Sequence, residues 1–218
     1  MNKSKNATKV PKKVLLLGNI KGDGLKSMEL VKKEYEKNYA YAKVLTPELF
    51  VSRRFTRLIL YPIIAFFHRG YDVYHIVDHS NAHVVHFLPK KKTVVTCHDI
   101  IPLLYPKKVT RSGLLFFKFS ISGLKKAKKI ISVSKNTKRD IVNKLGIDKK
   151  KITVMPVYIN LSQFKSIKDK GALRKKYGLE NKKVVLAFGS GFYKNTIRVL
   201  QGICLLYTSP SPRDSIAS

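Results

Sequence analysis

A histidine and an aspartate stand side by side directly after an apolar segment. His98 and Asp99 follow Thr93–Cys97, whose residues Thr-Val-Val-Thr-Cys are typical of a buried strand. Open α/β sheets bind their ligands at the carboxyl ends of the strands, so an imidazole and a carboxylate at this place can hold the hydroxyl groups of a ligand. The structural alternative is a capping aspartate beside a packed histidine, in a loop shaped by Pro102 and Pro106.

A glycine-containing loop follows another apolar segment near the N-terminus. Gly18–Gly24 reads Gly-Asn-Ile-Lys-Gly-Asp-Gly and lies between Lys13–Leu17 and an expected helix. Backbone N–H groups at Gly22 and Gly24 can bind a phosphate or a sugar hydroxyl there. The loop lacks the Gly-Lys-Ser/Thr of a P-loop, and Ser27 stands where a dinucleotide-binding fingerprint has its third glycine. A tight turn without a ligand is the alternative.

Four histidines lie within a short stretch, at His75, His79, His83 and His86. The last three share one face if Asp78 begins a helix, and such spacing raises the question of zinc. The first histidine falls on an expected strand, however, and no further cluster of metal ligands accompanies the four. We therefore expect no metal site and expect these histidines to satisfy local hydrogen bonds.

The elements that must position these residues alternate between strands and helices. The glycine loop is followed by a segment with helical spacing from Leu25, which makes the opening unit strand, loop and helix. Further strands are expected at Val73–Val77, Thr93–Cys97, Lys129–Val133 and Ile152–Met155. This alternation predicts an α/β fold with a Rossmann-like parallel sheet and helices on both faces.

The same pattern begins again near the C-terminus, where the apolar segment Val184–Phe188 ends in Gly189-Ser-Gly and precedes a helix-like stretch, Thr196–Leu200. A lysine-rich stretch of the sequence, Lys165–Lys176, is expected to form an exposed crossing between two domains. We expect a Rossmann-like domain over residues 1–160 and a truncated second α/β domain over 161–203. Residues 204–218 are rich in serine and proline near their end and are expected to be disordered.

Lysine and arginine outnumber the acidic residues by 44 to 13, which gives a formal net charge of +31. Such a charge attracts nucleic acids, anionic membranes and phosphorylated small molecules alike. The basic runs are scattered and match no nucleic-acid-binding motif, so no specific nucleic-acid partner is expected.

The cysteine content and the apolar runs indicate a cytoplasmic setting. Cys97 and Cys204 lie far apart, without the spacing of a disulfide framework or a metal site. The longest apolar run, Leu58–Phe67, is about half of the roughly 20 residues that cross a bilayer. Arg53, Arg54 and Arg57 precede it, which suggests peripheral contact with an anionic membrane at its inner face. An ordinary core helix is the alternative.

Four segments, in order and spacing, resemble the retaining glycosyltransferases of the GT-B fold that form family 4. They are Tyr71–Ile76, Thr93–Pro106, Ala127–Ile141 and Gly146–Pro156. The second, Thr-Val-Val-Thr-Cys-His-Asp-Ile-Ile-Pro-Leu-Leu-Tyr-Pro, is the most specific. A fifth segment, Gly189–Asn195, resembles the phosphate-binding start of the second domain, with tyrosine at position 193 where arginine is usual.

The resemblance implies a two-domain enzyme that transfers a sugar from a nucleotide-diphosphate sugar to a hydroxyl of a saccharide or lipid-linked acceptor. Configuration at the sugar would be retained, and neither a metal ion nor another cofactor would be needed. His98 and Asp99 would position hydroxyls at the reacting centre, and Lys194 would bind the donor diphosphate. Substrate contacts are thus expected at Gly22, Gly24, Ser134 and Lys194.

The sequence departs from the family pattern in its C-terminal part. The family's hinge usually reads Pro-Asn-Gly-Val-Asp, whereas Val-Tyr-Ile-Asn follows Pro156 here. The spaced pair of glutamates that binds the donor is absent, because Asp214 is the sole acidic residue after Glu180. The segment from Cys204 onward resembles translated sequencing adapter, so we expect it to be non-native. The chain is therefore expected to be an inactive fragment.

Two other functional classes remain open at this point. A basic nucleic-acid-binding protein would agree with the charge and with the interspersed tyrosine and phenylalanine, and steeply salt-dependent binding to random DNA would indicate it. A Rossmann-type NAD-dependent oxidoreductase would share the expected fold but needs the complete glycine fingerprint. Binding of a nicotinamide cofactor would distinguish it.

Overall fold

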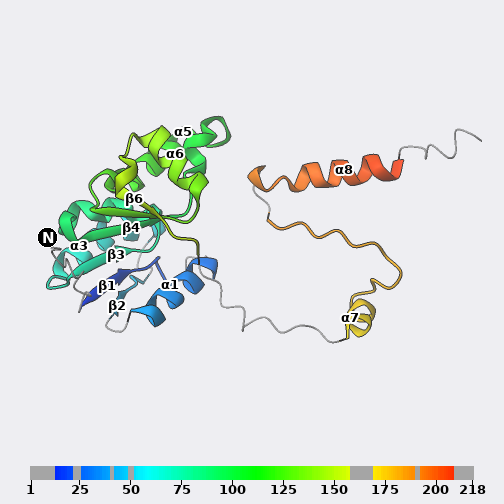
Figure 1. Ribbon diagram of the computed structural model, residues 1–218, viewed down its shortest axis with the longest axis horizontal. Coiled ribbons are helices and arrows are strands. Elements are labelled where there is room, and N and C mark those ends of the chain that lie inside the picture. The colour runs from blue at the N-terminus through cyan, green and yellow to red at the C-terminus, as the bar shows by residue number, and fades with distance from the viewer. Residues whose placement is uncertain are drawn as a thin grey trace, which may run out of the picture. The chain divides into compact units, whose positions relative to one another are not determined.

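The chain forms two units, Met1–Asn160 and Leu161–Ser218, which are described separately. The computed structural model describes residues 13–21, 26–39, 42–48, 52–157, 169–189 and 192–208 (Figure 1). Among these residues, no helix is long and apolar enough to cross a membrane.

A parallel sheet organises the first unit. Within the described residues it has six strands, in the order β2-β1-β3-β4-β5-β6, and every neighbouring pair runs parallel. The strands are β1 (Val14–Leu17), β2 (Ala42–Leu45), β3 (Val73–Ile76), β4 (Thr93–Cys97), β5 (Lys129–Ser132) and β6 (Ile152–Val154). The predicted parallel α/β fold is confirmed. Strand β2 was not among the predicted strands.

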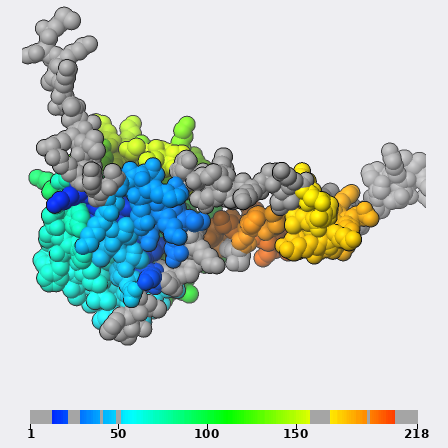
Figure 2. All heavy atoms as spheres, turned by 90° about the horizontal axis from the view of Figure 1, so that it is seen from below, coloured from blue at the N-terminus to red at the C-terminus, as the bar shows by residue number. Residues whose placement is uncertain are grey.

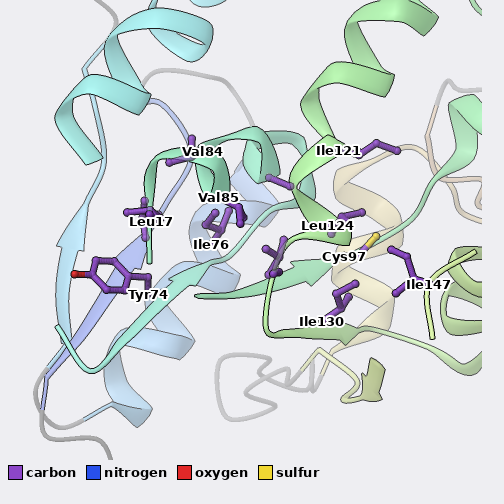
Figure 3. Packing of buried hydrophobic residues seen from close by; sticks show 14 of the residues in the cluster. Leu17, Tyr74, Ile76, Val84, Val85, Cys97, Ile121, Leu124, Ile130 and Ile147 are labelled. Atoms are coloured by element: carbon purple, nitrogen blue, oxygen red, sulfur yellow. The ribbon is translucent and has the colours of Figure 1, made fainter. Parts of the chain in front are cut away.

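The larger core lies on the sheet face that carries Leu15, Leu17, Tyr74 and Ile76 (Figure 3). These side chains alternate with residues on the opposite face, as the two-residue period of a strand requires. Several segments cover this face: α3 (Tyr61–Phe67), the 3₁₀ segment η2 (His79–Phe87), α5 (Arg111–Ser120), η5 (Ser122–Lys125) and α6 (Lys135–Leu145). These segments shield this face of the sheet from solvent, and none of the five residues of β4 is exposed.

Helix α1 (Lys26–Asn38) covers the opposite face, where Val14, Leu16 and Val77 form a second, smaller core with Tyr35 and Tyr39 packed against it. Figure 1 shows α1 on the other side of the strands from α5 and α6. Helices therefore lie on both faces of the sheet, as predicted.

The apolar run Leu58–Phe67 belongs to one continuous helical segment made of α2 (Arg53–Phe55), the π-helical stretch η1 (Thr56–Leu60) and α3. Ser52 begins the segment, because its hydroxyl oxygen accepts a hydrogen bond from the backbone N–H of Phe55. One side of the segment packs into the core through Tyr61 and Ala65. The run is thus a core helix on one side, with exposed residues on the other.

Short helical turns join the main elements of the first unit. They are η3 (Lys90–Lys92), α4 (Ile101–Leu104), η4 (Pro106–Lys108) and η6 (Lys149–Lys151). Turn η3 lies directly before β4, and η6 lies directly before β6. Helix α4 begins a few residues after β4 ends.

The second unit contains α7 (Lys170–Lys176), η8 (Phe192–Lys194) and α8 (Thr196–Thr208). The predicted strand Val184–Phe188 is wrong, because these residues form no strand and remain largely exposed. A strand needs a hydrogen-bonded neighbour, and no described residue of this unit supplies one. Helix α8 runs well past Leu200 and includes Cys204, so the disordered tail expected from residue 204 onward does not begin there.

Candidate functional site

The order of the strands defines a topological switch point between β1 and β3. The chain passes from β1 to β2 on one side of β1, whereas β3 pairs with β1 on its other side. The loops that leave β1 and β3 therefore diverge at the carboxyl edge of the sheet. In open α/β sheets this is the place where ligands bind.

A buried polar network occupies the switch point. The side-chain amide nitrogen of Asn19, just after β1, donates a hydrogen bond of 2.9 Å to Oδ2 of Asp78, just after β3. Asn81 in turn donates a bond of 3.0 Å from Nδ2 to Oδ1 of Asn19. The other carboxylate oxygen of Asp78 accepts from the backbone N–H of Ser80 at 2.9 Å, and this bond begins η2. These bonds fix the two loops relative to each other.

The carboxyl of Asp78 stays ionised at neutral pH within this network. Burial alone would raise its pKa, but neighbouring His79, the backbone N–H of Ser80 and the amide of Asn19 outweigh burial and hold the pKa below its ordinary value. The site floor therefore carries a fixed negative charge.

His79 connects this floor to the end of β4. Its Nδ1 lies 3.3 Å from Oδ1 of Asp78 and 3.4 Å from the backbone nitrogen of His98. The first contact needs a proton on Nδ1 and the second needs an unprotonated Nδ1, so only one of them can be a hydrogen bond. We assign the proton to Nδ1, because the carboxylate attracts it more strongly than an N–H group can. Burial lowers the pKa of His79 and so favours the neutral imidazole, although the nearby carboxylate of Asp78 acts in the opposite direction.

His98 lies at the carboxyl end of β4 and is only partly buried, so its side chain does not point into the apolar core. Its Nε2 lies 3.0 Å from the carbonyl oxygen of Val77. A carbonyl can only accept, so Nε2 carries a proton, and Nδ1 is the ring atom that is left to accept a hydrogen bond. The hydroxyl of Thr137 donates a bond of 3.0 Å to the carbonyl oxygen of His98 and ties its backbone to α6.

Asp99 is also partly exposed, and its Oδ1 accepts a hydrogen bond of 3.1 Å from the backbone N–H of Ile101 at the start of α4. This bond is a local turn contact and not a helix cap, because the N-cap of α4 is Ile100, which makes no side-chain capping bond. Ser134 does cap a helix, because its Oγ accepts a bond of 3.0 Å from the backbone N–H of Thr137 at the start of α6. The roles of both residues toward a ligand stay predictions.

The remaining predicted contacts are distributed differently. Gly22 and Gly24 lie outside the described residues. The start of their loop is anchored, because the hydroxyl of buried Tyr61 donates a hydrogen bond of 2.7 Å to the carbonyl oxygen of Gly18. Lys194 belongs to the second unit, where its aliphatic chain lies against Gly189 and its Nζ lies 5.4 Å from the centre of the Tyr193 ring. It is exposed.

The four neighbouring histidines do not converge. His75 bonds to Thr96 inside the sheet, His83 to the carbonyl oxygen of Arg57, and His86 to the hydroxyl of Ser122, whereas His79 faces Asp78. Among the described residues, no group of three or more His, Cys, Asp or Glu side chains is arranged to hold a metal ion.

A separate apolar pocket of about 330 Å³ lies between α1 and the residues that follow β6. Its lining includes Tyr35, Tyr39, Met155 and Pro156 but none of the predicted ligand contacts. The polar edge formed by Asp78, His79, His98 and Asp99 is the chemically better candidate, because a sugar ligand needs hydrogen-bonding groups rather than an apolar wall.

Sequence reasoning missed Asn19 and Asn81 and treated Asp78 only as a helix cap. The signal for Asn19 was its position directly after an apolar strand and a glycine, the same signal that identified His98. Asn81 carries no such signal, because it follows the strand end of β3 by several residues and reaches the network only through the 3₁₀ turn of η2.

The fold is that of a doubly wound α/β protein, and the polar side chains at its switch point form the candidate site. Residues 29–163 match the family model for Glycosyltransferase Family 4. This match covers more than half of the sequence, and the chain belongs to that family.

Among solved structures, the chain is similar to HepE of Anabaena, whose crystal structure holds UDP and glucose. The two share 18% sequence identity with a TM-score of 0.59, over 91% of this chain and 58% of the HepE chain. At this identity the likeness shows the fold, which is that of a GT-B glycosyltransferase. This chain thus spans little more than half the length of HepE. No curated protein matches the sequence.

Proposed function

We propose that the protein to which this chain belongs transfers a sugar from a nucleotide-diphosphate sugar to a hydroxyl of a saccharide or lipid-linked acceptor, with retained configuration. The observation that carries this proposal is the polar edge at the switch point of a family 4 domain. Partly exposed His98 and Asp99 follow β4 there, and His98 contacts Val77 and His79, the residues on either side of Asp78 in the sequence.

The acceptor side of the reaction is assigned to the first unit. Nδ1 of His98 can accept the hydrogen of an acceptor hydroxyl, since its Nε2 is already committed to Val77. Asp99 follows His98 in the same loop after β4, Ser134 lies in the loop after β5, and both would hold further hydroxyls. Positioning of this kind lowers the barrier because the reacting oxygen is held near the sugar carbon.

The donor side is assigned to backbone groups and to the second unit. Gly22 and Gly24 would approach the donor through N–H groups, and the ammonium of Lys194 would bind the diphosphate. In the reaction the bond between the sugar carbon and the diphosphate breaks, the acceptor oxygen bonds to that carbon, and the proton of the acceptor hydroxyl passes to the released nucleoside diphosphate. A fixed positive charge beside the leaving diphosphate stabilises the charge that develops there. The solved complex of HepE with UDP and glucose supports a donor of this class.

The test is an assay of the full-length protein that contains this chain. A panel of nucleotide-diphosphate sugars is offered with saccharide and lipid-linked acceptors, and release of the nucleoside diphosphate is measured. We expect transfer from one donor, with the anomeric configuration retained in the product as read by nuclear magnetic resonance. Binding of DNA or of a nicotinamide cofactor, together with no affinity for any nucleotide sugar, would contradict the proposal.

A further inference from the structure

The helical segment made of α2, η1 and α3 exposes apolar side chains where a surface helix normally carries polar ones. Phe55, Ile59, Ile63 and Phe66 follow one another at intervals of three or four residues, the spacing of a single helix face, and all four are exposed. Phe67 beside them is 76% exposed. The segment packs its opposite side into the core through Tyr61 and Ala65, so the stripe is the face of the segment that is turned toward solvent.

Helix α5 extends the stripe sideways. Leu115 is 71% exposed and Phe119, one helical turn later, is 50% exposed. Two contacts join α5 to the first segment. The guanidinium of Arg54 lies 5.9 Å from the centre of the Phe116 ring. The ring of His83 lies 5.6 Å from that of Phe119 while its Nε2 bonds to the carbonyl oxygen of Arg57.

We call this surface the outer face; it comprises the exposed side chains of α2, η1, α3 and α5. Figure 2 shows the cyan part of the chain, which includes α2, η1 and α3, at the surface of the first unit. Exposed apolar surface on this scale marks a site of interaction rather than scattered single residues.

The charge around the outer face is of one sign. No acidic residue occurs from Arg53 to Tyr71 or from Ile100 to Arg139 in the sequence. Arg69 lies over the ring of Phe66 at 4.4 Å from its centre, and Arg54 lies beside Phe116. The two arginines are therefore held next to aromatic rings, exposed Phe66 and partly buried Phe116, and the partner must accept both cations and apolar side chains.

We propose that the outer face binds the surface of an anionic lipid bilayer, with its phenylalanine, isoleucine and leucine side chains among the upper acyl chains and its arginines at the lipid phosphates. An anionic bilayer presents negative charge directly above an apolar layer, which is the pattern that this face complements. An acidic protein would match the charge but leave the apolar stripe exposed. The proposal concerns attachment alone and does not depend on sugar transfer.

Vesicle flotation of the 218-residue chain tests the electrostatic part. Phosphatidylcholine vesicles with and without phosphatidylglycerol are compared for the unchanged chain and for the double variant Arg54→Gln, Arg69→Gln. Because the whole chain is strongly basic, the matched control removes two charges elsewhere, at exposed Arg139 on α6 and exposed Lys144 on the same helix. We expect a loss of affinity of about fivefold for each outer-face arginine, and a much smaller loss for the control.

The absence of tryptophan from the chain permits a direct test of insertion. A single tryptophan is placed at the outer face by Phe67→Trp, or at the exposed position 30 on α1 by Leu30→Trp as the control. With anionic vesicles, emission from position 67 is expected to shift to shorter wavelength and to be quenched by lipids brominated on their acyl chains. Emission from position 30 is expected to change little.

Three outcomes would overturn the proposal. The first is equal loss of binding by the two double variants, which would mean attraction by net charge alone. The second is equal quenching at positions 67 and 30, or none at either. The third is self-association of the unchanged chain in solution that the Phe67→Trp change abolishes, which would assign the outer face to a second copy of the chain. The tryptophan variants keep all of the arginines, so the quenching measurement tests the proposal even if an arginine variant fails to fold.

Discussion

The side-chain amide of Asn19 and the carboxylate of Asp78 are 59 positions apart in the sequence and are joined by a buried hydrogen bond of 2.9 Å. This bond links the ends of β1 and β3, the two strands between which the sheet reverses its order. The loops that leave these strands include the glycine loop and the start of η2. A ligand at this edge would therefore meet two loops that are already held together.

Exchange of the two groups tests whether this bond holds the site. Asp78→Asn places two amide groups against each other and removes the charge, so we expect a loss of about 1–3 kcal/mol in the free energy of unfolding. The double variant Asn19→Asp, Asp78→Asn restores a donor and an acceptor in reversed order, and Asn81 can still donate to position 19. Denaturant unfolding should show the double variant to be more stable than Asp78→Asn alone. If the double variant instead lost as much stability as the single variants Asn19→Asp and Asp78→Asn lose together, the two side chains would not be directly bonded.

His75 should make the stability of the first unit depend on pH. The side chain is buried between the sheet and α1, bonds to Thr96 at 2.8 Å and lies with its ring edge-on to that of Tyr35. Burial, with a smaller effect of His98, lowers its pKa from 6.5 to about 4. The unfolded chain then binds the proton more readily than the folded one, so stability is complete above about pH 6.5 and falls as the pH is lowered toward 4.

The expected loss over this interval is about 3 kcal/mol. His75→Gln keeps a polar group for Thr96 and removes the titration, so its stability should fall less steeply between these pH values. Burial also lowers the pKa of His79 and of His83, which leaves part of the slope in the variant. His68→Gln, at a partly exposed histidine, serves as the control. Parallel curves for the unchanged chain and His75→Gln would rule out His75 as the source.

In the complete protein, His98→Ala is expected to lower kcat by roughly ten- to a thousandfold, the range found on removal of one positioned polar group. The bond from Nε2 to Val77 would be lost with the ring, so His98→Gln provides a second variant that retains a donor. A catalytic contact predicts a fall in kcat with little change in KM for the donor. Unchanged kinetics would remove His98 from the site.

Gly123 is expected to tolerate no side chain. A Cβ at this position would collide with the backbone carbonyl oxygen of Ala82, where η5 crosses η2 in the core. A backbone atom held by a 3₁₀ helix cannot move aside as a flexible side chain can, so Gly123→Ala should destabilise the unit by several kcal/mol, on the order of other overpacked core positions. Thermal unfolding would show it. Gly146→Ala has open space around its Cβ and should cost less, through its positive φ alone.

The strands that form the sheet could largely be predicted, because each is a short apolar run bounded by polar residues. Strand Thr93–Cys97 was predicted with both ends correct. Its threonine and valine residues favour a strand, and none of its five residues is exposed. Strand β2 was not predicted, because it lies at the edge of the sheet and its residues, Ala-Lys-Val-Leu, do not form the continuous apolar run of a buried strand. The predicted strand Val184–Phe188 failed for the opposite reason: its apolar residues lack a paired neighbour.

The positions of His98 and Asp99 at the sheet edge could be predicted from the strand that precedes them. The network beneath them could not, because it depends on bonds between Asn19, Asp78 and Asn81, which only the folded chain brings together. The capping role of Ser134 shows the limit in another way. A serine two residues after a strand suits a ligand contact and a helix cap equally, and the sequence does not distinguish them.

Limited proteolysis of the 218-residue chain should leave the first unit intact while the second is digested. The strands and helices between Lys13 and Pro156 bury a continuous core, whereas in the second unit Leu186 is 73% and Phe188 is 77% exposed. Proteases cleave backbone that unfolds locally, and the second unit has few packing contacts that would oppose such unfolding. Mass spectrometry of tryptic fragments should therefore find a stable product that ends near Pro156.

We also expect the uncut chain to transfer no sugar from any nucleotide donor, because the glutamate pair expected to bind the donor is absent from it. Equal rates of cleavage in both units would contradict the first expectation. Measurable turnover by the chain alone would contradict the second and would place donor binding within these 218 residues.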